Sequence, residues 1–307
     1  MRFRQELAAL LAQVPPGQVT TFGALARALG DTRAAVPVFR VLRRDRLHGW
    51  YRAVRADGSL AFSDATQRLA EEGVSVQGGT VRDFPQILFE TFGTRRPLKA
   101  LRREQRSLAS RVVLEDRFEG PRTVAGFDVS YEDSEAHAAA VLLEWGSLEV
   151  LEEVGLTVPV EFPYISTYLA YREFEPVARC FARFKTSPSL LLVDGNGTLH
   201  PNRFGVACYV GLQLDRPTIG VAKSLLTGRP DREALSPGES APVRLEREEI
   251  GHVLRPPRGK PVYVSPGHRI SGGTALRFVR RLCHSRIPEP LRLADRAARR
   301  RRRAHEG

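Results

Sequence analysis

The sequence has few cysteines and no long apolar run. Its 307 residues include 3 cysteines, Cys180, Cys208 and Cys283, and these form no CxxC pair. A zinc site or disulfide framework is therefore not expected, and reduced thiols predict a cytoplasmic protein. No stretch approaches the roughly 18 apolar residues that a membrane-spanning helix needs, so no membrane partner is predicted. The apolar segment near the N-terminus is short and carries Glu6, which is typical of an amphipathic helix and not of a secretory leader.

Lysine is also scarce, although the chain is strongly basic. Lys99, Lys185, Lys223 and Lys260 are its lysines, so arginines make up nearly all of the 47 basic residues. The net charge is +12 and the pI is near 10.3. Such a balance favours a polyanionic partner, most simply nucleic acid, but does not separate DNA from RNA. The run Arg299–Arg303 is expected to add nonspecific attraction for phosphates.

Residues 2–92 have the pattern of a small helical domain. Apolar residues from Phe3 to Leu11 repeat at helical spacing, and prolines 15 and 16 end that helix. Thr20 or Thr21 can cap a second helix that stops at Gly30. An arginine-bearing third helix is expected over residues 33–44. Two short helices, a turn and a basic helix favour a helix-turn-helix that binds DNA.

The segment VPPGQVTTFGALARALG resembles the winged-helix part of O6-alkylguanine-DNA alkyltransferases, and the resemblance covers about residues 5–76. The family's reactive Pro-Cys-His-Arg motif corresponds to residues 49–52 here, where Trp50 replaces the cysteine. No thiolate is available to accept an alkyl group, so the domain resembles the non-catalytic alkyltransferase-like proteins. The resemblance implies a DNA-binding or damage-sensing module that uses Phe22, Arg40, Trp50, Tyr51 and Arg52.

Two departures weaken the lesion specificity that this resemblance implies. The family's base-rotating tyrosine corresponds to Phe22, which lacks the hydroxyl, and its intercalating arginine corresponds to Val36. A domain that packs only against its neighbour, or one that recruits a protein partner, therefore stays open. A boundary near residues 90–97 divides the chain into a first domain at 1–92 and a second at 93–307. A basic amphipathic helix over residues 98–113 opens the second domain.

Beyond residue 121 the pattern changes to strands. Residues 123–129, 138–144 and 148–158 are predicted as three consecutive antiparallel strands. A helix over residues 169–184 then leads to the short apolar run Leu190–Val193, which ends in Asp194. A helical crossover makes this last strand a parallel neighbour of the first. The order predicts a ribonuclease H-like α/β fold, a mixed sheet with flanking helices, preceded by the winged-helix domain.

This topology brings two distant carboxylates together. Asp128 and Asp194 lie near the carboxyl ends of adjacent strands, where open α/β sheets place their chemistry. Glu173, near the start of the crossover helix, is the third candidate. Mg²⁺ prefers oxygen ligands and keeps several waters, so a few carboxylates plus a substrate phosphate suffice to hold it. A cation held there can activate water and neutralise charge on the phosphate.

Six ordered motifs between about residues 98 and 300 resemble endonuclease V: VAGFDVSY, FPYISTYLAYRE, VDGNGTLHPNRFGVA, PTIGVAKSLLTG, VYVSPGHRIS and IPEPLRLAD. The resemblance implies a DNA repair enzyme that uses Mg²⁺, with Mn²⁺ as a substitute. Such an enzyme cuts the second phosphodiester bond 3′ to deoxyinosine or another deaminated base and leaves 3′-hydroxyl and 5′-phosphate ends. By position it implies Asp128, Glu173 and Asp194 as metal ligands, Lys223 beside the scissile phosphate, and His268 near the attacking water or a second metal.

FPYIS resembles the wedge loop of that family, in which Pro163, Tyr164 and Ile165 would enter the duplex where the damaged base leaves. The family form ends in Pro-Gly, whereas Ser166 and Thr167 stand here, so hypoxanthine specificity is in question. Cys208 and Tyr209 also replace a usual Ser-His pair. The resemblance assigns the rest of the base pocket to the remaining matching positions. These are Leu169, Gly195, His200 and Leu226.

Two other functions stay open at this point. A ribonuclease for inosine-containing RNA would carry the same motifs. A non-cleaving sensor of DNA damage is suggested by Trp50 and by the altered wedge loop. Against the sensor, a pure DNA binder gains nothing from three carboxylates that face phosphate.

Overall fold

The computed structural model describes residues 1–132 and 134–305. The chain forms two compact units, the first comprising Met1–Arg103 with Glu161–Ser166 and the second Glu104–Val160 with Thr167–Gly307. The interpretation from sequence divided the chain between residues 92 and 93, and its upper limit, residue 307, lies outside the described residues. No helix among the described residues combines the length and apolarity needed to cross a membrane.

The first unit is mainly helical, as the sequence predicts. Thr21 caps its second helix by accepting a hydrogen bond from the Ala24 amide at 3.0 Å, and Gly30 ends that helix in the left-handed region at φ 102°. Phe3 and Leu7 are fully buried, which confirms the amphipathic first helix. Its helices are α1 Phe3–Leu11, α2 Phe22–Leu29, α3 Ala35–Asp45 and α4 Ala65–Glu71, with 3-10 turns η1 Thr32–Ala34 and η2 Trp50–Arg52. Its short strands are β1 Thr20–Thr21, β2 Ala53–Val54, β3 Val76–Gln77 and β4 Thr80–Val81.

The next helix, α5, spans Pro97–Ala109 and ends four residues before the predicted Val113. The division between the two units runs through it. Leu98 and Gln105, both nearly inaccessible to solvent, lie on its buried side. Gln105 belongs to the second unit, and because a buried polar side chain needs hydrogen-bond partners, its partners matter for the site below.

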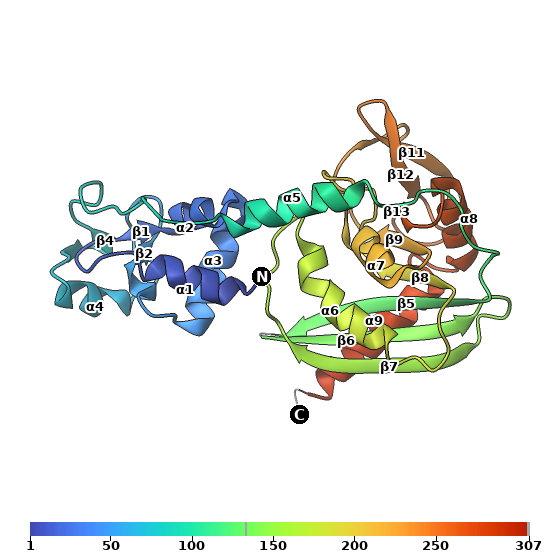
Figure 1. Cartoon of the computed structure of the whole chain (residues 1–307), viewed down its shortest axis with the longest axis horizontal. Helices are drawn as coiled ribbons and strands as arrows, with labels where there is room; N and C mark the ends of the chain where they lie inside the picture. Colours follow the sequence, from blue (N-terminus) through green and yellow to red (C-terminus); the bar gives the residue numbers. More distant parts are fainter. Residues whose placement is uncertain (133, 306–307) are drawn as a thin grey trace. The chain divides into compact units, whose positions relative to one another are not determined.

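The second unit is built on a nine-stranded mixed sheet (Figure 1). The strand order is β10-β11-β12-β13-β9-β8-β5-β6-β7. The strands are β5 Thr123–Glu132, β6 Glu135–Glu144, β7 Val150–Pro159, β8 Leu190–Asp194, β9 Thr218–Ala222, β10 Arg229–Pro230, β11 Ser240–Leu245, β12 Glu248–Leu254 and β13 Val262–His268. The strands β5, β6 and β7 form the predicted antiparallel meander, and β8 pairs in parallel with both β5 and β9. This is the ribonuclease H-like arrangement that the sequence predicts.

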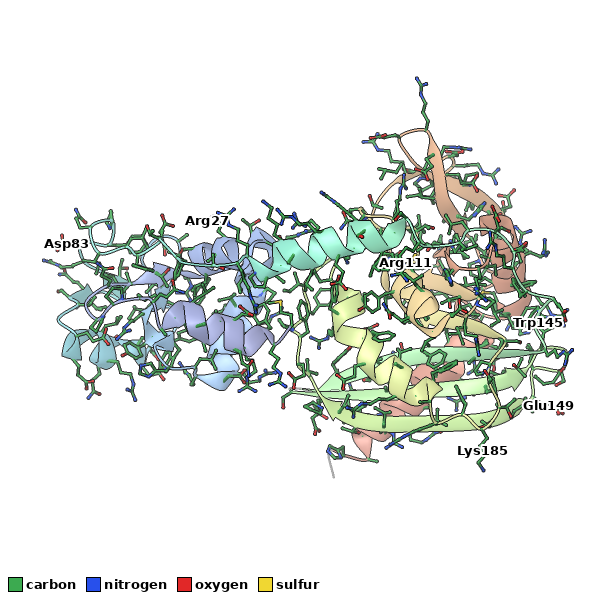
Figure 2. The ribbon with its side chains drawn as sticks, viewed as in Figure 1. Arg27, Asp83, Arg111, Trp145, Glu149 and Lys185 are labelled. Carbon is green, nitrogen blue, oxygen red and sulfur yellow. The ribbon has the colours of Figure 1, made fainter. Side chains whose placement is uncertain are left out.

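Helices cover both faces of this sheet, which explains the uninterrupted apolar run in β8. Leu191 and Val193 pack in a core with residues of α6 Leu169–Phe181 and α7 Val206–Leu214. Leu190 and Leu192 pack on the other face, in a core with residues of α8 Gly272–Leu282 and α9 Glu289–Arg303. A strand buried on both sides needs apolar residues at every position and not at alternate ones. Figure 2 shows Trp145, Glu149 and Lys185 at the end of the sheet where β5 begins.

A close approach of α9 to β5 depends on Gly126. A Cβ at this position would lie 2.2 Å from the carbonyl carbon of Pro290, at the start of α9. No side chain fits there, so the glycine lets the helix rest directly on the strand. Because alternate strand residues face the same side, Asp128 points towards the α9 side of the sheet as well.

Candidate functional site

Asp128, in the middle of β5, lies beside Asp194, the last residue of β8. Phe127 pairs with Val193 in the parallel register, which places the two aspartates one position further on. Burial, followed by repulsion from Asp194, raises the pKa of Asp128 to about 7. Two acids 66 positions apart in the chain therefore share one site, as the topology predicts.

Glu173 reaches the same site from the second turn of α6. Its pKa is raised well above the usual range by burial, then by the charges of Asp194 and Asp128. The Tyr131 hydroxyl donates a hydrogen bond to Glu173 Oε1 at 3.4 Å, and the guanidinium of Arg172 lies 3.8 Å over the Tyr131 ring. These contacts position the carboxylate beside the two aspartates. The structure thus brings the three predicted acids together.

A cation already lies among these acids. Lys223 follows the last residue of β9, and its ammonium group donates a hydrogen bond to Asp194 Oδ2 within an ion pair. Burial by itself would lower the pKa of Lys223, but Asp194 outweighs this and raises it. The lysine side chain is 44% exposed, so it is free to turn towards an incoming phosphate.

Asp295 is a fourth acid at this site, and sequence reasoning missed it. Its charge acts on both Asp128 and Lys223, although it comes from α9, more than a hundred residues further along the chain. Arg299 Nε donates to Asp295 Oδ1 at 2.9 Å. The motif IPEPLRLAD ends in this residue, which is the signal that would have found it.

The donor set fits a hard divalent cation. Among residues 1–132 and 134–305, no three His, Cys, Asp or Glu side chains form a ready-made metal cage. Mg²⁺ does not need one, since it is usually bound by one or two carboxylates, several waters and the substrate's phosphates. Asp128 and Asp194 supply such a pair. Their mutual repulsion, relieved here only by the single charge of Lys223, is what a divalent ion would offset.

His268 does not join the acids, which corrects the expectation that it lies near the attacking water. It ends β13, which runs antiparallel to β9, and it pairs with Thr218 at the amino end of that strand. Asp194 pairs with Val221, three residues and about 10 Å further along β9. His268 is instead 3% exposed, accepts a hydrogen bond from the Val113 amide at 3.3 Å, and faces Asp215 at 3.6 Å. Burial lowers its pKa.

Thr167 adopts a backbone conformation that normally requires glycine. Its φ is +73°, in the left-handed region where a β-branched residue is an outlier. Two buried side chains hold its carbonyl oxygen: Gln105 Nε2 donates to it at 2.8 Å, and His200 Nε2 lies 3.0 Å away. Asn202 Nδ2 in turn donates to Gln105 Oε1 at 3.0 Å. The chain therefore holds a threonine in a backbone conformation that favours glycine, at the position where the resembling family has a glycine.

Gly195 and Leu169, two of the predicted pocket residues, lie near one another. A Cβ on Gly195 would be 2.5 Å from Val206 Cγ1 and 3.6 Å from Leu169 Cδ2. Leu226 is 37% exposed, in the segment that follows β9. In the predicted wedge, Tyr164 is 56% exposed, Pro163 is partly buried and Ile165 is 1% exposed. Tyr164 is thus the wedge side chain available to enter a duplex.

The aromatic residues of the first unit form one cluster around Trp50. The Phe62 ring packs edge-on against Trp50 at 5.1 Å and against Phe22 at 6.1 Å, and the guanidinium of Arg46 covers Trp50 at 3.8 Å. Trp50 is only 8% exposed as a result. The structure therefore brings Phe22 and Trp50 together beneath an arginine.

Of the other predicted residues of the first unit, Tyr51 packs its ring edge-on against Trp50 at 5.9 Å, and Arg52 and Arg40 lie further along the chain on either side. Arg52 is 7% exposed and forms an ion pair with Glu72, which also accepts a hydrogen bond from the Tyr51 hydroxyl at 2.6 Å. Arg40 is exposed on α3. Arg52 and Tyr51 are thus internal contacts of the unit here, whereas Arg40 is accessible.

Family comparisons divide the chain in the same way as the motifs do. The family model described as Endonuclease V matches residues 106–296. The model described as the DNA-binding domain of 6-O-methylguanine DNA methyltransferase matches residues 2–74. The three cysteines all lie outside that second match. The methyltransferase model therefore matches here without a thiol.

Similar proteins give the same division. A protein of Picrophilus torridus named bifunctional methyltransferase/endonuclease is 34% identical over 94% of this chain and 93% of its own length. The crystal structure of endonuclease V from Streptomyces avermitilis is 35% identical, with a TM-score of 0.63 over 68% of this chain and 94% of that one. Endonuclease V of Ciona intestinalis, solved with a 24mer DNA containing an inosine followed by a ribo-adenosine, is 27% identical, with a TM-score of 0.61 over 68% of this chain and 98% of that one.

Proposed function

The chain belongs to the endonuclease V family of nucleases that act on DNA, and from this premise we propose that it cuts DNA strands near deaminated bases. The cut falls at the second phosphodiester bond 3′ to deoxyinosine and leaves 3′-hydroxyl and 5′-phosphate ends. The observation that carries the proposal is the meeting of Asp128 and Asp194 beside Lys223 at one edge of the sheet. This arrangement suits phosphodiester hydrolysis with a divalent cation, for which we propose Mg²⁺ and, as a substitute, Mn²⁺.

Each residue of the site has a distinct task in this proposal. Asp128 and Asp194 hold the cation, which when bound neutralises phosphate charge and makes water a better nucleophile. Glu173 and Asp295 border the same charge cluster. Lys223 turns from Asp194 to the scissile phosphate, where its ammonium stabilises the charge that develops in the transition state. His268 is left out of these steps because it lies beside the amino end of β9, whereas Lys223 follows the carboxyl end of that strand.

Recognition of the base is assigned to the wedge and pocket. Tyr164 enters the duplex as the base leaves, and its exposed ring supports that role. The flipped base is received beside Thr167, Leu169, Gly195 and His200, with Leu226 nearby. The first domain, residues 1–92 in our proposed division, binds DNA or samples damage without transferring alkyl groups, because Trp50 stands in the place of a cysteine.

We expect the full chain to nick a duplex that carries one deoxyinosine and to leave the matched undamaged duplex intact. A single 5′-labelled product, two bonds 3′ to the lesion, should form with Mg²⁺ or Mn²⁺ and disappear when EDTA removes the metal. Gel electrophoresis beside a size ladder measures this. Tight binding to the damaged duplex without any product in Mn²⁺ would overturn cleavage and leave a damage sensor.

Inosine-containing RNA is a second candidate substrate. The DNA bound by the Ciona intestinalis protein carries a ribo-adenosine after its inosine, so a 2′-hydroxyl next to the lesion is compatible with a related site. Matched DNA, RNA and mixed strands of one sequence, compared by kcat/KM, decide between the two substrates.

Thr167→Gly is expected to leave the stability of the protein nearly unchanged and to alter its preference among deaminated bases. Left-handed backbone costs a non-glycine residue about 1–2 kcal/mol, which offsets the roughly 1 kcal/mol that added chain freedom usually costs. Melting temperature should therefore stay within a few degrees of the parent, while the ratio of kcat/KM for deoxyinosine over other deaminated bases changes several-fold. Thr186→Gly, in exposed backbone of ordinary φ, is the control and should lose about 1 kcal/mol. Equal losses of stability in both variants would contradict the strain at Thr167.

A further inference from the structure

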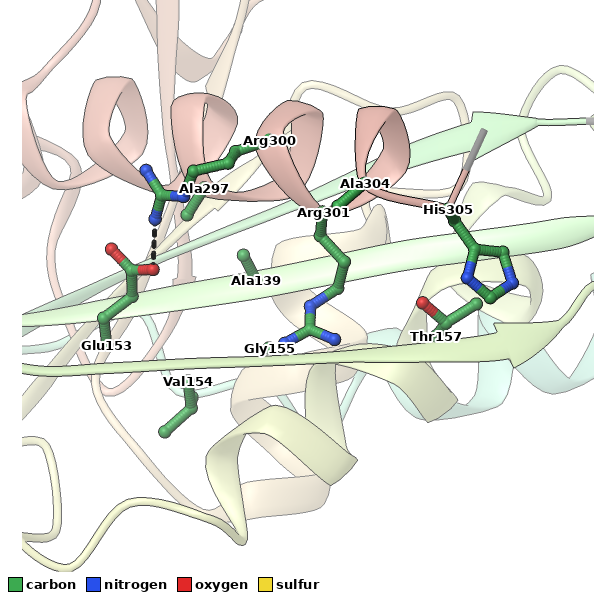
Figure 3. A pocket seen from close by; sticks show the side chains of 10 residues that line it. All are labelled: Ala139, Glu153, Val154, Gly155, Thr157, Ala297, Arg300, Arg301, Ala304 and His305. Carbon is green, nitrogen blue, oxygen red and sulfur yellow. Dashed lines mark hydrogen bonds and ion pairs between the residues drawn. The ribbon is translucent and has the colours of Figure 1, made fainter. Parts of the chain in front are cut away.

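A cavity separates the second half of α9 from strands β6 and β7 (Figure 3). Its volume is about 370 Å³. Small residues on the strands and the helix make the space, and polar residues surround it. The small residues are Ala139, Gly155, Ala297 and Ala304, and the polar ones are Glu153, Thr157, Arg300, Arg301 and His305. A space of this kind, within reach of several basic groups, is suited to an anion.

Arg301 is a basic side chain of this cavity whose charge has no acidic partner among the described residues. Its guanidinium lies against β7 over Gly155, where a Cβ would come within 2.7 Å of Arg301 Nε. Its neighbour Arg300 forms an ion pair with Glu153, drawn as a dashed line in Figure 3. Within residues 1–132 and 134–305, Arg301 itself forms no hydrogen bond or ion pair. Its five donors are therefore available to an oxyanion.

The imidazole of His305 lines one end of the cavity, and the His137 ring lies 5.5 Å from it, outside the lining. His305 lies above Thr157 in Figure 3, and its Nε2 is 3.0 Å from Glu135. Thr157 Oγ1 is hydrogen-bonded to His137 Nδ1 at 3.0 Å. His137 is fully buried, and its Nε2 has no hydrogen-bond partner among the described residues. The guanidinium of Arg301 therefore lies in the cavity without a partner among the described residues. The buried His137, next to the lining residue Thr157, also has one ring nitrogen without a hydrogen bond.

The cavity lies at a defined distance from the catalytic acids. Asp128, Ala139 and Gly155 are consecutive partners across β5, β6 and β7, so the cavity floor is two strand spacings, about 10 Å, from Asp128. On α9, Asp295 at the acid site and Arg301 at the cavity are six residues, about 9 Å, apart. Both distances, across the strands and along α9, separate the acid site from the cavity on the same side of the sheet.

We infer that this cavity binds a backbone phosphate of the DNA strand that is being cut. The inference rests on the proposed function. At about 3.4 Å of rise per nucleotide, a separation near 10 Å corresponds to about three nucleotides from the scissile bond. Arg301 donates to the phosphate oxygens, and Thr157 and His305 border it. A phosphate held here fixes the register of the strand over the acids without reading its sequence.

Arg301→Gln and Arg303→Gln test the site as a matched pair. Both remove one positive charge from an exposed side chain of the same helix, but Arg301 lines the cavity and Arg303 does not. Anisotropy of a labelled deoxyinosine duplex, with EDTA present, gives the dissociation constant over a series of salt concentrations. We expect Arg301→Gln to weaken binding about fivefold or more and to lower the salt slope by about 0.9, with less than a twofold change for Arg303→Gln. Equal effects of the two variants, or no effect of either, overturn the inference.

Gly155→Ala supplies a test that changes no charge. Its methyl group would displace the Arg301 guanidinium, so DNA binding should weaken although the net charge is unchanged. If Gly155→Ala melts like the parent and binds DNA as tightly, the inference is overturned. If this variant does not fold, the comparison of Arg301→Gln with Arg303→Gln tests the inference by itself. If the parent binds and nicks the deoxyinosine duplex, and the Arg301→Gln and Gly155→Ala variants bind it equally well, only the phosphate site is refuted. A parent that binds the duplex but never nicks it refutes the proposed function.

Discussion

Asp194→Asn is expected to lower the rate of nicking at deoxyinosine on the order of 10³-fold or more. Asparagine keeps the shape of the side chain but removes the negative charge that, with Asp128, would hold the cation. It also removes the ion pair with Lys223. Single-turnover cleavage of a 5′-labelled duplex at saturating enzyme and Mg²⁺ measures the chemical step separately from binding.

Anisotropy with the same duplex serves as the check on folding and DNA affinity, which this substitution should leave intact. Asp231→Asn is the matched control, because Asp231 is an exposed aspartate whose partner is Arg244 at 3.0 Å, in the hairpin at the far end of the sheet. It should cleave within twofold of the parent rate. If Asp194→Asn also nicks at the parent rate, the metal assignment is wrong.

The sheet around this site could be predicted wherever one local pattern determined the structure. A run as short as Leu190–Val193 has to be a strand, and a helix before it makes that strand a parallel neighbour of β5. The order of β9 to β13 was not predicted, because β9 ends at Ala222 and its partner β13 begins only at Val262. No local pattern indicates a pairing across so long a connection.

The acids show where sequence reasoning about a site succeeds and where it stops. Asp128 and Asp194 follow from topology alone. Asp295 stands in a helix with many arginines, where a single acid is usually read as part of a surface ion pair. Only the folded chain reveals that its charge acts on Asp128. His268 shows the opposite error, because a motif names a residue but not the direction of its strand.

Backbone conformation was the least accessible property. In the sequence, a threonine in place of a pocket glycine put only the base specificity in question. The structure shows a positive φ at Thr167, with the side chains of Gln105 and His200 against its carbonyl oxygen, at a conformational cost. Residue type alone does not predict this conformation, because tertiary hydrogen bonds and not local preference decide it here.

Glu173→Gln should separate catalysis from stability, with a loss of nicking of about 10²-fold and no loss of melting temperature. Glutamine is isosteric, and the Tyr131 hydroxyl can still donate to its carbonyl oxygen as it does to Glu173 Oε1. The substitution removes a negative charge that Asp194 and Asp128 both repel within a buried site. Because that repulsion opposes folding of the metal-free chain, relieving it should hold or raise the melting temperature in EDTA.

Glu175→Gln is the control for this prediction, two residues further along α6. Glu175 is exposed and forms an ion pair with Arg179 at 2.7 Å, an arrangement that contributes little at a surface. It should nick at the parent rate and melt within about a degree or two of the parent. Full activity in Glu173→Gln would remove Glu173 from the catalytic set. If Glu173→Gln lowers both activity and melting temperature, Glu173 instead supports the fold. A purely catalytic carboxylate can be replaced without loss of stability, because it contributes nothing to folding.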